Sequence, residues 1–264
     1  MDMTQLQDGQ RLAAEKNFMK ILVLADIHAN WPALQAIRES FDACFFLGDL
    51  VDYGSNPAPC VDWVQHHATA AVRGNHDHAV AQRIVARGGT GLRRLAAATR
   101  PLQWQALQPQ QMKFLSRLPV TLNLELGGLR FALVHATPRD PMDEYLTDDP
   151  AGWQQRLNGT EADFVLVGHT HVPFCLELNG VKVVNPGSVG QPRDGDPRCA
   201  YAIIDDGKVH LCRVEYDIDA TLRHLREAGI VGEILEIAEA TLRSGGLVPA
   251  RFPRDRPEDS GTES

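Results

Sequence analysis

Six short apolar runs, each followed at once by polar residues, constrain the fold of this chain more than any other feature. The runs are four or five residues long and rich in Val, Leu, Ile, Ala and Phe. They cover residues 21–25, 44–47, 68–72, 130–134, 164–167 and 181–184. Short continuous apolar runs of this kind are typical of strands that are buried on both faces. We therefore predict six buried strands.

Helical patterns alternate with these strands in the first half of the chain. Asn30 can cap a helix that has Pro32 in its first turn and continues through Leu34, Ile37 and Phe41 at helical spacing. A second pattern starts at residues 57–59, which contain two prolines. Alternation of strands and helices predicts an α/β fold. The second half is richer in strands and turns.

The chain divides into a core and several peripheral segments. Residues 1–18 lack the apolar centre of a secretory signal peptide, and Met19 offers a natural start, so we interpret them as an N-terminal extension. We predict a core over residues 19–215 with a helical insertion at 79–118, C-terminal helices packed on the core at 216–246, and a flexible tail at 247–264.

The charge and the cysteines limit the partners and the compartment. The 264 residues carry a formal net charge of -8, so no global basic field attracts nucleic acid, and a phosphate-bearing partner must be captured locally. No apolar run approaches the length of a membrane span. The five cysteines are odd in number and form no Cys-x-x-Cys pair. We expect a cytoplasmic protein with no membrane association and no stable nucleic-acid complex.

Each predicted strand is followed by residues that can carry chemistry. The clusters are Asp26-Ile27-His28, Gly48-Asp49-Leu50-Val51-Asp52, Gly74-Asn75-His76-Asp77, His135, Gly168-His169-Thr170-His171 and Asn185-Pro186-Gly187-Ser188. In open α/β sheets the residues after the strands converge at one rim, where ligands bind. Asp, His and Asn suit Mn, Fe, Zn or Ni. Any one cluster could be an ordinary turn, but a single metal site explains all of them together.

In this order, the motifs resemble the calcineurin-like metallophosphoesterase family from about Met19 to the strand after Pro197. Residues 26–30, 48–57 and 185–193 are most similar to the small bacterial and archaeal phosphoesterases of that family. The resemblance implies an α/β fold in which a two-sheet β-sandwich is flanked by helices, in αββα layers. One departure is Ala29, where family members commonly have glycine; it removes no ligand.

The resemblance also implies a dinuclear site for two divalent metal ions. One ion would be surrounded by Asp26, His28, Asp49 and His171, and the other by Asp49, Asn75, His135 and His169. Asp49 would bridge the two, since cations roughly 3.5 to 4 Å apart need a shared anionic ligand to offset their repulsion. We favour Mn, with Fe, Ni and Zn as alternatives. The remaining positive charge would make the centre a local anion trap on an acidic protein.

The mechanism implied by the resemblance is in-line attack on phosphorus by a metal-bridging hydroxide. His76 would lie near the leaving oxygen as general acid or electrostatic stabiliser, with Asp77 orienting its imidazole. Asp52 would be a hydrogen-bond acceptor rather than a metal ligand. Arg139 and Arg193 are candidate phosphate contacts, whereas Arg73 pairs as readily with a carboxylate.

The function that follows is hydrolysis of a small phosphodiester or a nucleotide-like phosphoester. Substrate choice would depend on residues 79–118 and 139–160, and we interpret the insertion as a lid over a small substrate. A Ser/Thr protein phosphatase is the alternative enzyme. A non-catalytic metal-binding regulatory module is the alternative from another class, although the complete ligand set and His76 argue against it.

Overall fold

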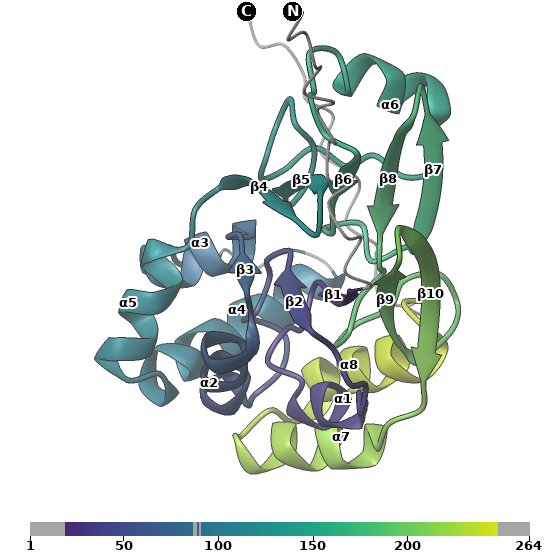
Figure 1. Cartoon of the computed structure of the whole chain (residues 1–264). Helices are drawn as coiled ribbons and strands as arrows, with labels where there is room; N and C mark the ends of the chain where they lie inside the picture. Colours follow the sequence, from purple (N-terminus) through teal and green to yellow (C-terminus); the bar gives the residue numbers. More distant parts are fainter. Residues whose placement is uncertain (1–18, 87–88, 90, 248–264) are drawn as a thin grey trace, which may run out of the picture.

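A sandwich of two five-stranded sheets forms the centre of the computed structural model, which describes residues 19–86, 89 and 91–247 (Figure 1). The first sheet has the order β10-β9-β1-β2-β3, and the second has the order β4-β5-β6-β8-β7. The strands are β1 (Lys20–Leu24), β2 (Ala43–Phe46), β3 (Ala70–Ala71), β4 (Thr121–Leu126), β5 (Leu129–Val134), β6 (Phe164–Leu166), β7 (Phe174–Leu178), β8 (Val181–Asn185), β9 (Cys199–Asp205) and β10 (Lys208–Val214).

Helices cover the outer faces of both sheets. Residues of α1 to α5 pack against the first sheet, and α6 packs against the second sheet (Figure 1). The helices are α1 (Trp31–Ala36), α2 (Pro57–His67), α3 (Asn75–Ala81), α4 (Gly91–Ala106), α5 (Pro109–Arg117), α6 (Pro150–Arg156), α7 (Ile218–Glu227) and α8 (Gly232–Ser244). The predicted αββα layering is confirmed.

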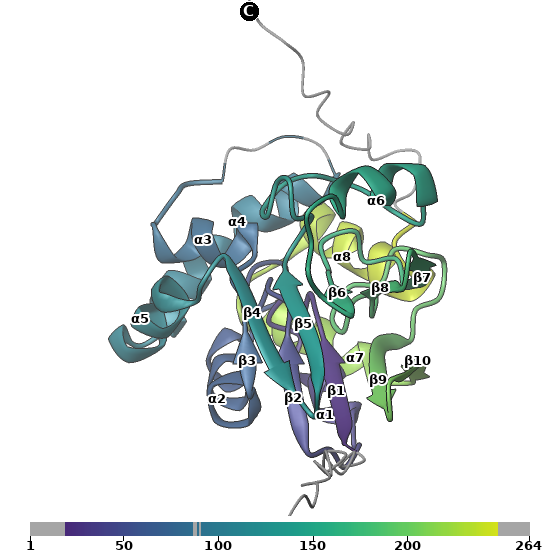
Figure 2. The same cartoon turned by 45° about the horizontal axis from the view of Figure 1, so that its top comes forward.

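The burial of β1 explains why its sequence is continuously apolar. Ile21 and Val23 face the interior of the sandwich, while Leu22 and Leu24 belong to the core beneath the helices. Figure 2 shows β4 and β5 in front of β1 and β2, with the sandwich interior between them. A strand that is buried on both faces has no solvent-facing positions for polar residues.

All six predicted strands are present, as β1, β2, β3, β5, β6 and β8. The remaining strands, β4, β7, β9 and β10, were not individually predicted. In β4 and β7 most of the residues alternate between more and less exposed positions, so they lack a continuous apolar run. The first predicted helix ends at Ala36, and Ile37 and Phe41 pack against the core from the segment that follows.

The C-terminal helices pack on the rest of the molecule through a shared apolar cluster. Leu222 and Leu225 of α7 and Leu242 of α8 are buried together with Leu95 of α4 and Tyr53. No helix among the described residues is long and apolar enough to cross a membrane. The predicted extension at 1–18 and most of the predicted tail, 248–264, lie outside the described residues.

The two sheets are joined by aromatic packing, which makes Phe131 a test of the sandwich. Its ring centroid lies 5.2 Å from that of Phe45 in the opposite sheet and 5.2 Å from that of Phe164. Phe131→Ala should lower the free energy of unfolding by about 3 to 5 kcal/mol, because a buried aromatic leaves a cavity. Urea unfolding measures this. Leu211→Ala, at a side chain that is 44% exposed, is the control, and equal losses in the two variants would contradict the packing.

Candidate metal centre

The predicted ligands converge at one end of the sandwich. β1 and β2 run parallel in the first sheet, and β5 and β6 run parallel in the second, so the loops after them meet at the same rim. The ligands lie as follows: Asp26 and His28 after β1, Asp49 after β2, Asn75 at the start of α3, His135 after β5, and His169 and His171 after β6.

Asp26, His28 and His171 form one buried group whose potential ligand atoms all lie within 4.8 Å of one another. The Nε2 atom of His171 is 3.3 Å from Oδ1 of Asp26, and Nε2 of His28 is 3.9 Å from the same oxygen. These atoms therefore face a common point, as four-coordinate or larger metal sites require.

Asp49, His135 and His169 form a second group of the same kind. The Nε2 atom of His135 is 3.2 Å from Oδ2 of Asp49 and 3.2 Å from Nδ1 of His169. Oδ2 of Asp49 is also 3.9 Å from Nε2 of His28, which belongs to the first group. Asp49 thus lies between the two groups, at the position expected of a bridging ligand.

Two buried oxygens at this rim have no hydrogen-bond donor among the described residues. They are Oδ1 of Asp26 and Oδ1 of Asn75. Leaving a buried acceptor unsatisfied costs about 1 to 3 kcal/mol. A cation would satisfy both oxygens, so the donor set fits the metal ions that the family resemblance implies.

Backbone carbonyls fix the orientation of three of the histidine rings. Nδ1 of His28 is 2.9 Å from the carbonyl of Val51, and Nδ1 of His135 is 2.8 Å from the carbonyl of Leu47. Nδ1 of His171 faces the carbonyl of Gln191 in the same way. A carbonyl only accepts, so Nδ1 carries the proton and Nε2 is directed to the centre. His169 is reversed: its Nε2 faces the carbonyl of Asp143, and its Nδ1 faces the centre.

Burial and mutual charge set the protonation of the group. Burial lowers the pKa of His28 and His169 to about 3, which keeps both rings neutral. Burial raises the pKa of Asp26 to about 8. Burial also opposes the charged form of His135, but the carboxylate of Asp49 outweighs it and raises the pKa of His135 to about 10. In the absence of cations, protons therefore neutralise part of this centre.

Five of the ligands adopt left-handed backbone conformations although none is glycine. Their φ angles are 55° for Asp26, 50° for His28, 61° for Asp49, 66° for His169 and 59° for His171. Each such residue costs of order 1 kcal/mol. Ala29, at the position where the family commonly has glycine, has a φ of 51°. Contacts with the surrounding loops must stabilise these strained conformations.

Asp77 holds two of these loops together. Its buried carboxylate accepts hydrogen bonds from the backbone N–H groups of Asp49 (2.8 Å), Leu50 (2.7 Å) and Gly74 (3.0 Å). The prediction that Asp77 orients His76 is therefore wrong. Neighbouring residues on a helix point in different directions, so His76 and Asp77 of α3 do not face each other.

Asp52 orients His76 instead. Oδ2 of Asp52 is 2.7 Å from Nδ1 of His76. The expectation that Asp52 is a hydrogen-bond acceptor is confirmed. Nε2 of His76 lies 3.3 Å from the hydroxyl of Tyr53, on the side of the ring away from Asp52.

The insertion helix α4 contacts the loop that carries Asp52. Arg100 of α4 donates to the carboxylate of Asp52, and Gln103 of α4 accepts from the backbone N–H of Asp52 at 2.9 Å. The interpretation of the insertion as a lid stays a prediction. Arg100 and Gln103 were not among the predicted site residues, because nothing in their spacing shows that α4 faces a loop 48 to 51 residues earlier.

Of the three candidate arginines, Arg193 lies beside Tyr53, which neighbours His76. The guanidinium carbon of Arg193 lies 5.9 Å from the ring centroid of Tyr53, which is itself 4.8 Å from that of His76. Arg139 pairs with Glu144. Arg73 contacts the carbonyl of Ser116 at 3.4 Å.

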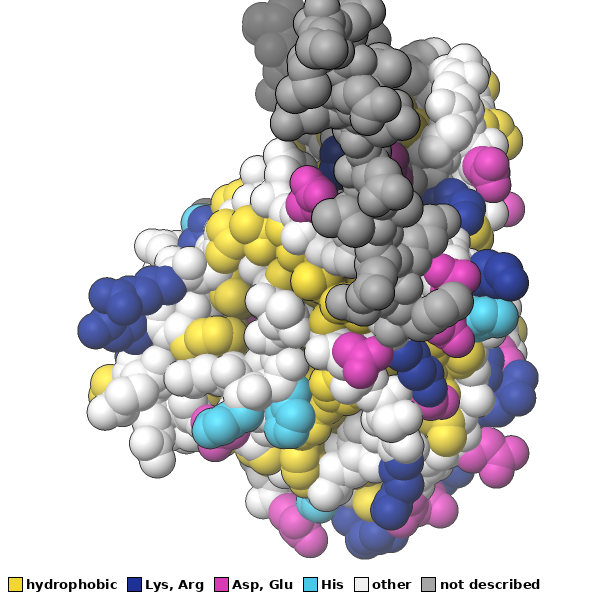
Figure 3. All heavy atoms as spheres, viewed as in Figure 1, with side chains coloured by type: hydrophobic (Ala, Val, Ile, Leu, Met, Phe, Trp, Pro, Cys, Tyr) yellow, Lys and Arg dark blue, Asp and Glu magenta, His cyan; other side chains and the backbone are white. Residues whose placement is uncertain are grey.

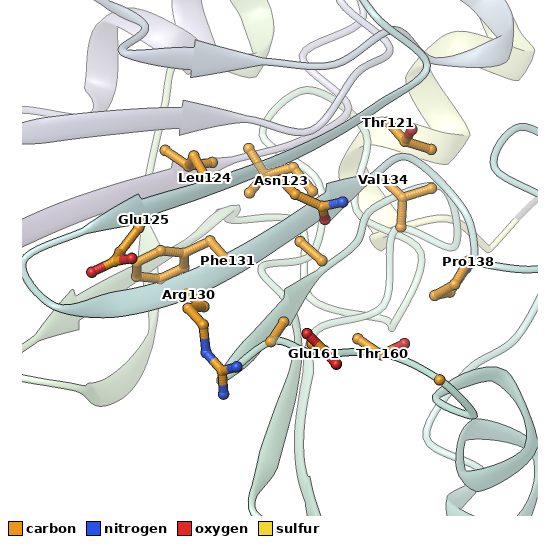
Figure 4. A pocket seen from close by; sticks show the side chains of 14 residues that line it. Thr121, Asn123, Leu124, Glu125, Arg130, Phe131, Val134, Pro138, Thr160 and Glu161 are labelled. Atoms are coloured by element: carbon orange, nitrogen blue, oxygen red, sulfur yellow. The ribbon is translucent and has the colours of Figure 1, made fainter.

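A separate hollow of about 670 Å³ lies on the outer face of β4 and β5 (Figure 4). Its lining includes Asn123, Glu125, Arg130 and Glu161. Arg130 is paired with Asp163. None of the predicted site residues lines this hollow, so it is distinct from the metal centre.

The comparisons with known sequences agree with the geometry. Residues 19–207 match the model of the calcineurin-like phosphoesterase superfamily domain. An uncharacterised protein of Methanocaldococcus jannaschii is 32% identical over 225 residues, covering 75% of this chain and 88% of that protein. The phosphodiesterase YfcE of Escherichia coli K12 is 24% identical over 204 residues, covering 71% of this chain and 88% of that protein.

Solved structures show the same fold. A metallophosphoesterase from Sphaerobacter thermophilus has a TM-score of 0.73 and 32% identity, covering 87% of this chain and 100% of that chain. A hypothetical protein from Pyrococcus horikoshii has a TM-score of 0.73 and 23% identity, covering 86% of this chain and 98% of that chain. With a family model that spans residues 19–207 and this arrangement of Asp, His and Asn, the chain belongs to the calcineurin-like phosphoesterase superfamily.

Proposed function

We propose that this protein is a dinuclear metal-dependent hydrolase that cleaves a small phosphodiester or a nucleotide-like phosphoester. The observation that carries the proposal is the position of Asp49, whose carboxylate lies within 4 Å of histidines from both ligand groups. The similarity to the phosphodiesterase YfcE supports the substrate class.

The ligand groups suit two divalent cations, for which we propose Mn, with Fe, Ni and Zn as alternatives. Cations bound by Asp26, His28, Asp49, Asn75, His135, His169 and His171 would supply an activated water and would bind phosphoryl oxygens. The neutral imidazoles of His28 and His169 are already in the ligating state.

His76 is the proposed general acid. Burial opposes its charged form, but Asp49 and Asp52 outweigh this and raise the pKa of His76 above its ordinary value. The two carboxylates therefore favour the protonated form of the ring. With Nδ1 engaged by Asp52, Nε2 is the nitrogen that can give a proton to a leaving oxygen. Its side chain is 15% exposed, which leaves it accessible from the rim.

The surface charges and the free cysteines are consistent with a small substrate and a cytoplasmic location. On the described part of the face in Figure 3, acidic and basic side chains are intermixed without a continuous basic band. This supports the expectation that no stable nucleic-acid complex forms. The five cysteines are all free thiols, which fits a reducing cytoplasm.

Hydrolysis of bis-p-nitrophenyl phosphate tests the proposal directly. Chelator-treated protein should be inactive, and Mn should restore activity. Asp49→Asn should lower the restored activity by more than about 100-fold, because losing a metal ligand costs more than losing a neighbour of one. Asp163→Asn, at a surface carboxylate paired with Arg130, is the control. Greater activity on a phosphopeptide than on any diester would favour a protein phosphatase, and metal binding without turnover would favour a regulatory module.

The role of His76 is tested by changing the leaving group. His76→Ala should lower kcat on diphenyl phosphate about 10²- to 10⁴-fold, the usual contribution of a general acid. The effect on bis-p-nitrophenyl phosphate should be much smaller, because nitrophenolate leaves without a proton. His66→Ala, at an exposed histidine of α2, should change neither rate. Equal losses on both esters would rule out proton donation by His76.

Metal binding should release protons. At pH 7, Asp26 with a pKa of about 8 and His135 with a pKa of about 10 are both mainly protonated without metal, and both must lose a proton to ligate. Binding of Mn should therefore release about two protons and tighten as the pH rises. Calorimetric titration in buffers of different ionisation enthalpy measures this number. Asp26→Asn should release about one proton fewer. No buffer dependence would contradict the assigned protonation.

A further inference from the structure

We propose that Arg100, in the insertion helix α4, is a positioning residue for His76 and acts through Asp52. The inference rests on the proposed function of His76 as a proton donor. It also assigns a catalytic purpose to the insertion, which would otherwise be a packing element.

The three side chains form a continuous chain of hydrogen bonds that runs from the partly exposed ring of His76 into the interior. Oδ2 of Asp52 accepts from Nδ1 of His76 at 2.7 Å and from Nε of Arg100 at 3.0 Å. Nη2 of Arg100 donates to the same oxygen, and its Nε also lies 3.2 Å from Oδ1. Asp52 is fully buried, and Arg100 is 7% exposed. One carboxylate oxygen therefore links the guanidinium directly to the imidazole.

The planar guanidinium fixes the plane of the carboxylate. Two nitrogens of Arg100 contact Asp52, and a third, Nη1, donates to the carbonyl of Ile84 at 3.1 Å. The guanidinium is planar and is bound by Asp52 on one side and by the carbonyl of Ile84 on the other, so it cannot rotate freely. The carboxylate that it binds is therefore also fixed. Without Arg100, Asp52 would be a buried charge facing a single partner, free to turn away from His76.

The backbone of the same loop has anchors of its own. Thr99 accepts from the backbone N–H of Tyr53 at 3.1 Å. Gln103 accepts from the backbone N–H of Asp52 and donates to the carbonyl of Gly54 at 3.0 Å. Since these contacts hold the backbone without Arg100, replacing Arg100 should leave the loop in place and free only the carboxylate.

The kinetic test compares Arg100→Met with Arg94→Met. Arg94 lies on the same helix and pairs with Glu233 at 2.7 Å on the surface, so it is a matched control. Arg100→Met should lower kcat on diphenyl phosphate roughly 10- to 100-fold, with little effect on bis-p-nitrophenyl phosphate. Arg100→Lys should recover part of the loss. In the His76→Ala background, Arg100→Met should have no further effect. Equal losses on both esters, or an additive loss in that background, would overturn the proposal.

A second readout does not depend on activity. In protein labelled with ¹⁵N-histidine, the Nδ1–H signal that disappears in His76→Ala reports the hydrogen bond to Asp52. It should be lost in Arg100→Met and retained in Arg94→Met, while circular dichroism shows that both variants are folded. Retention of the signal in Arg100→Met would refute the positioning role. An inactive wild-type protein would refute the proposed function, and the signal would still decide the role of Arg100.

Discussion

The burial of four aspartates at one rim of a β-sandwich is the constraint on which the rest of this structure depends. A buried carboxylate without partners is strongly unfavourable, and each of the four has a different solution. Asp77 accepts three backbone N–H groups, Asp52 pairs with Arg100, and Asp49 faces His135. Asp26 keeps one oxygen that has no donor within the described part of the chain. The loops, the start of α3 and the insertion helix are arranged to meet these requirements.

The C-terminal helices contribute to the same arrangement. Thr221 of α7 donates to Oδ1 of Asn30 at 2.8 Å, and the amide of Asn30 donates to the carbonyl of Gly190 at 2.9 Å. Asn30 also caps α1, as its sequence position predicted. A single side chain therefore joins the loop after β1 to the loop that follows β8, and elements without any metal ligand still restrain the ligand loops.

Sequence patterns predicted the buried strands and the ligands because both depend on local order. A strand such as β1 is apolar throughout, and Asp26 and His28 follow it directly. Partners distant in sequence were not predictable: Arg100 meets Asp52 across 48 positions, and no periodicity encodes that contact. Asp77 is adjacent to His76 in sequence but not in its side-chain contacts, so sequence adjacency does not predict its role.

The left-handed backbone conformation of the ligand residues affects how such a protein can change over evolutionary time. At these positions asparagine or glycine would relieve backbone strain, so a lineage released from the need for catalysis could gain stability by replacing Asp26 or His169, whose φ angles are 55° and 66°. Stability and activity are therefore in direct competition at the same backbone positions. The intact set of strained Asp and His residues is what selection for chemistry would maintain against that gain.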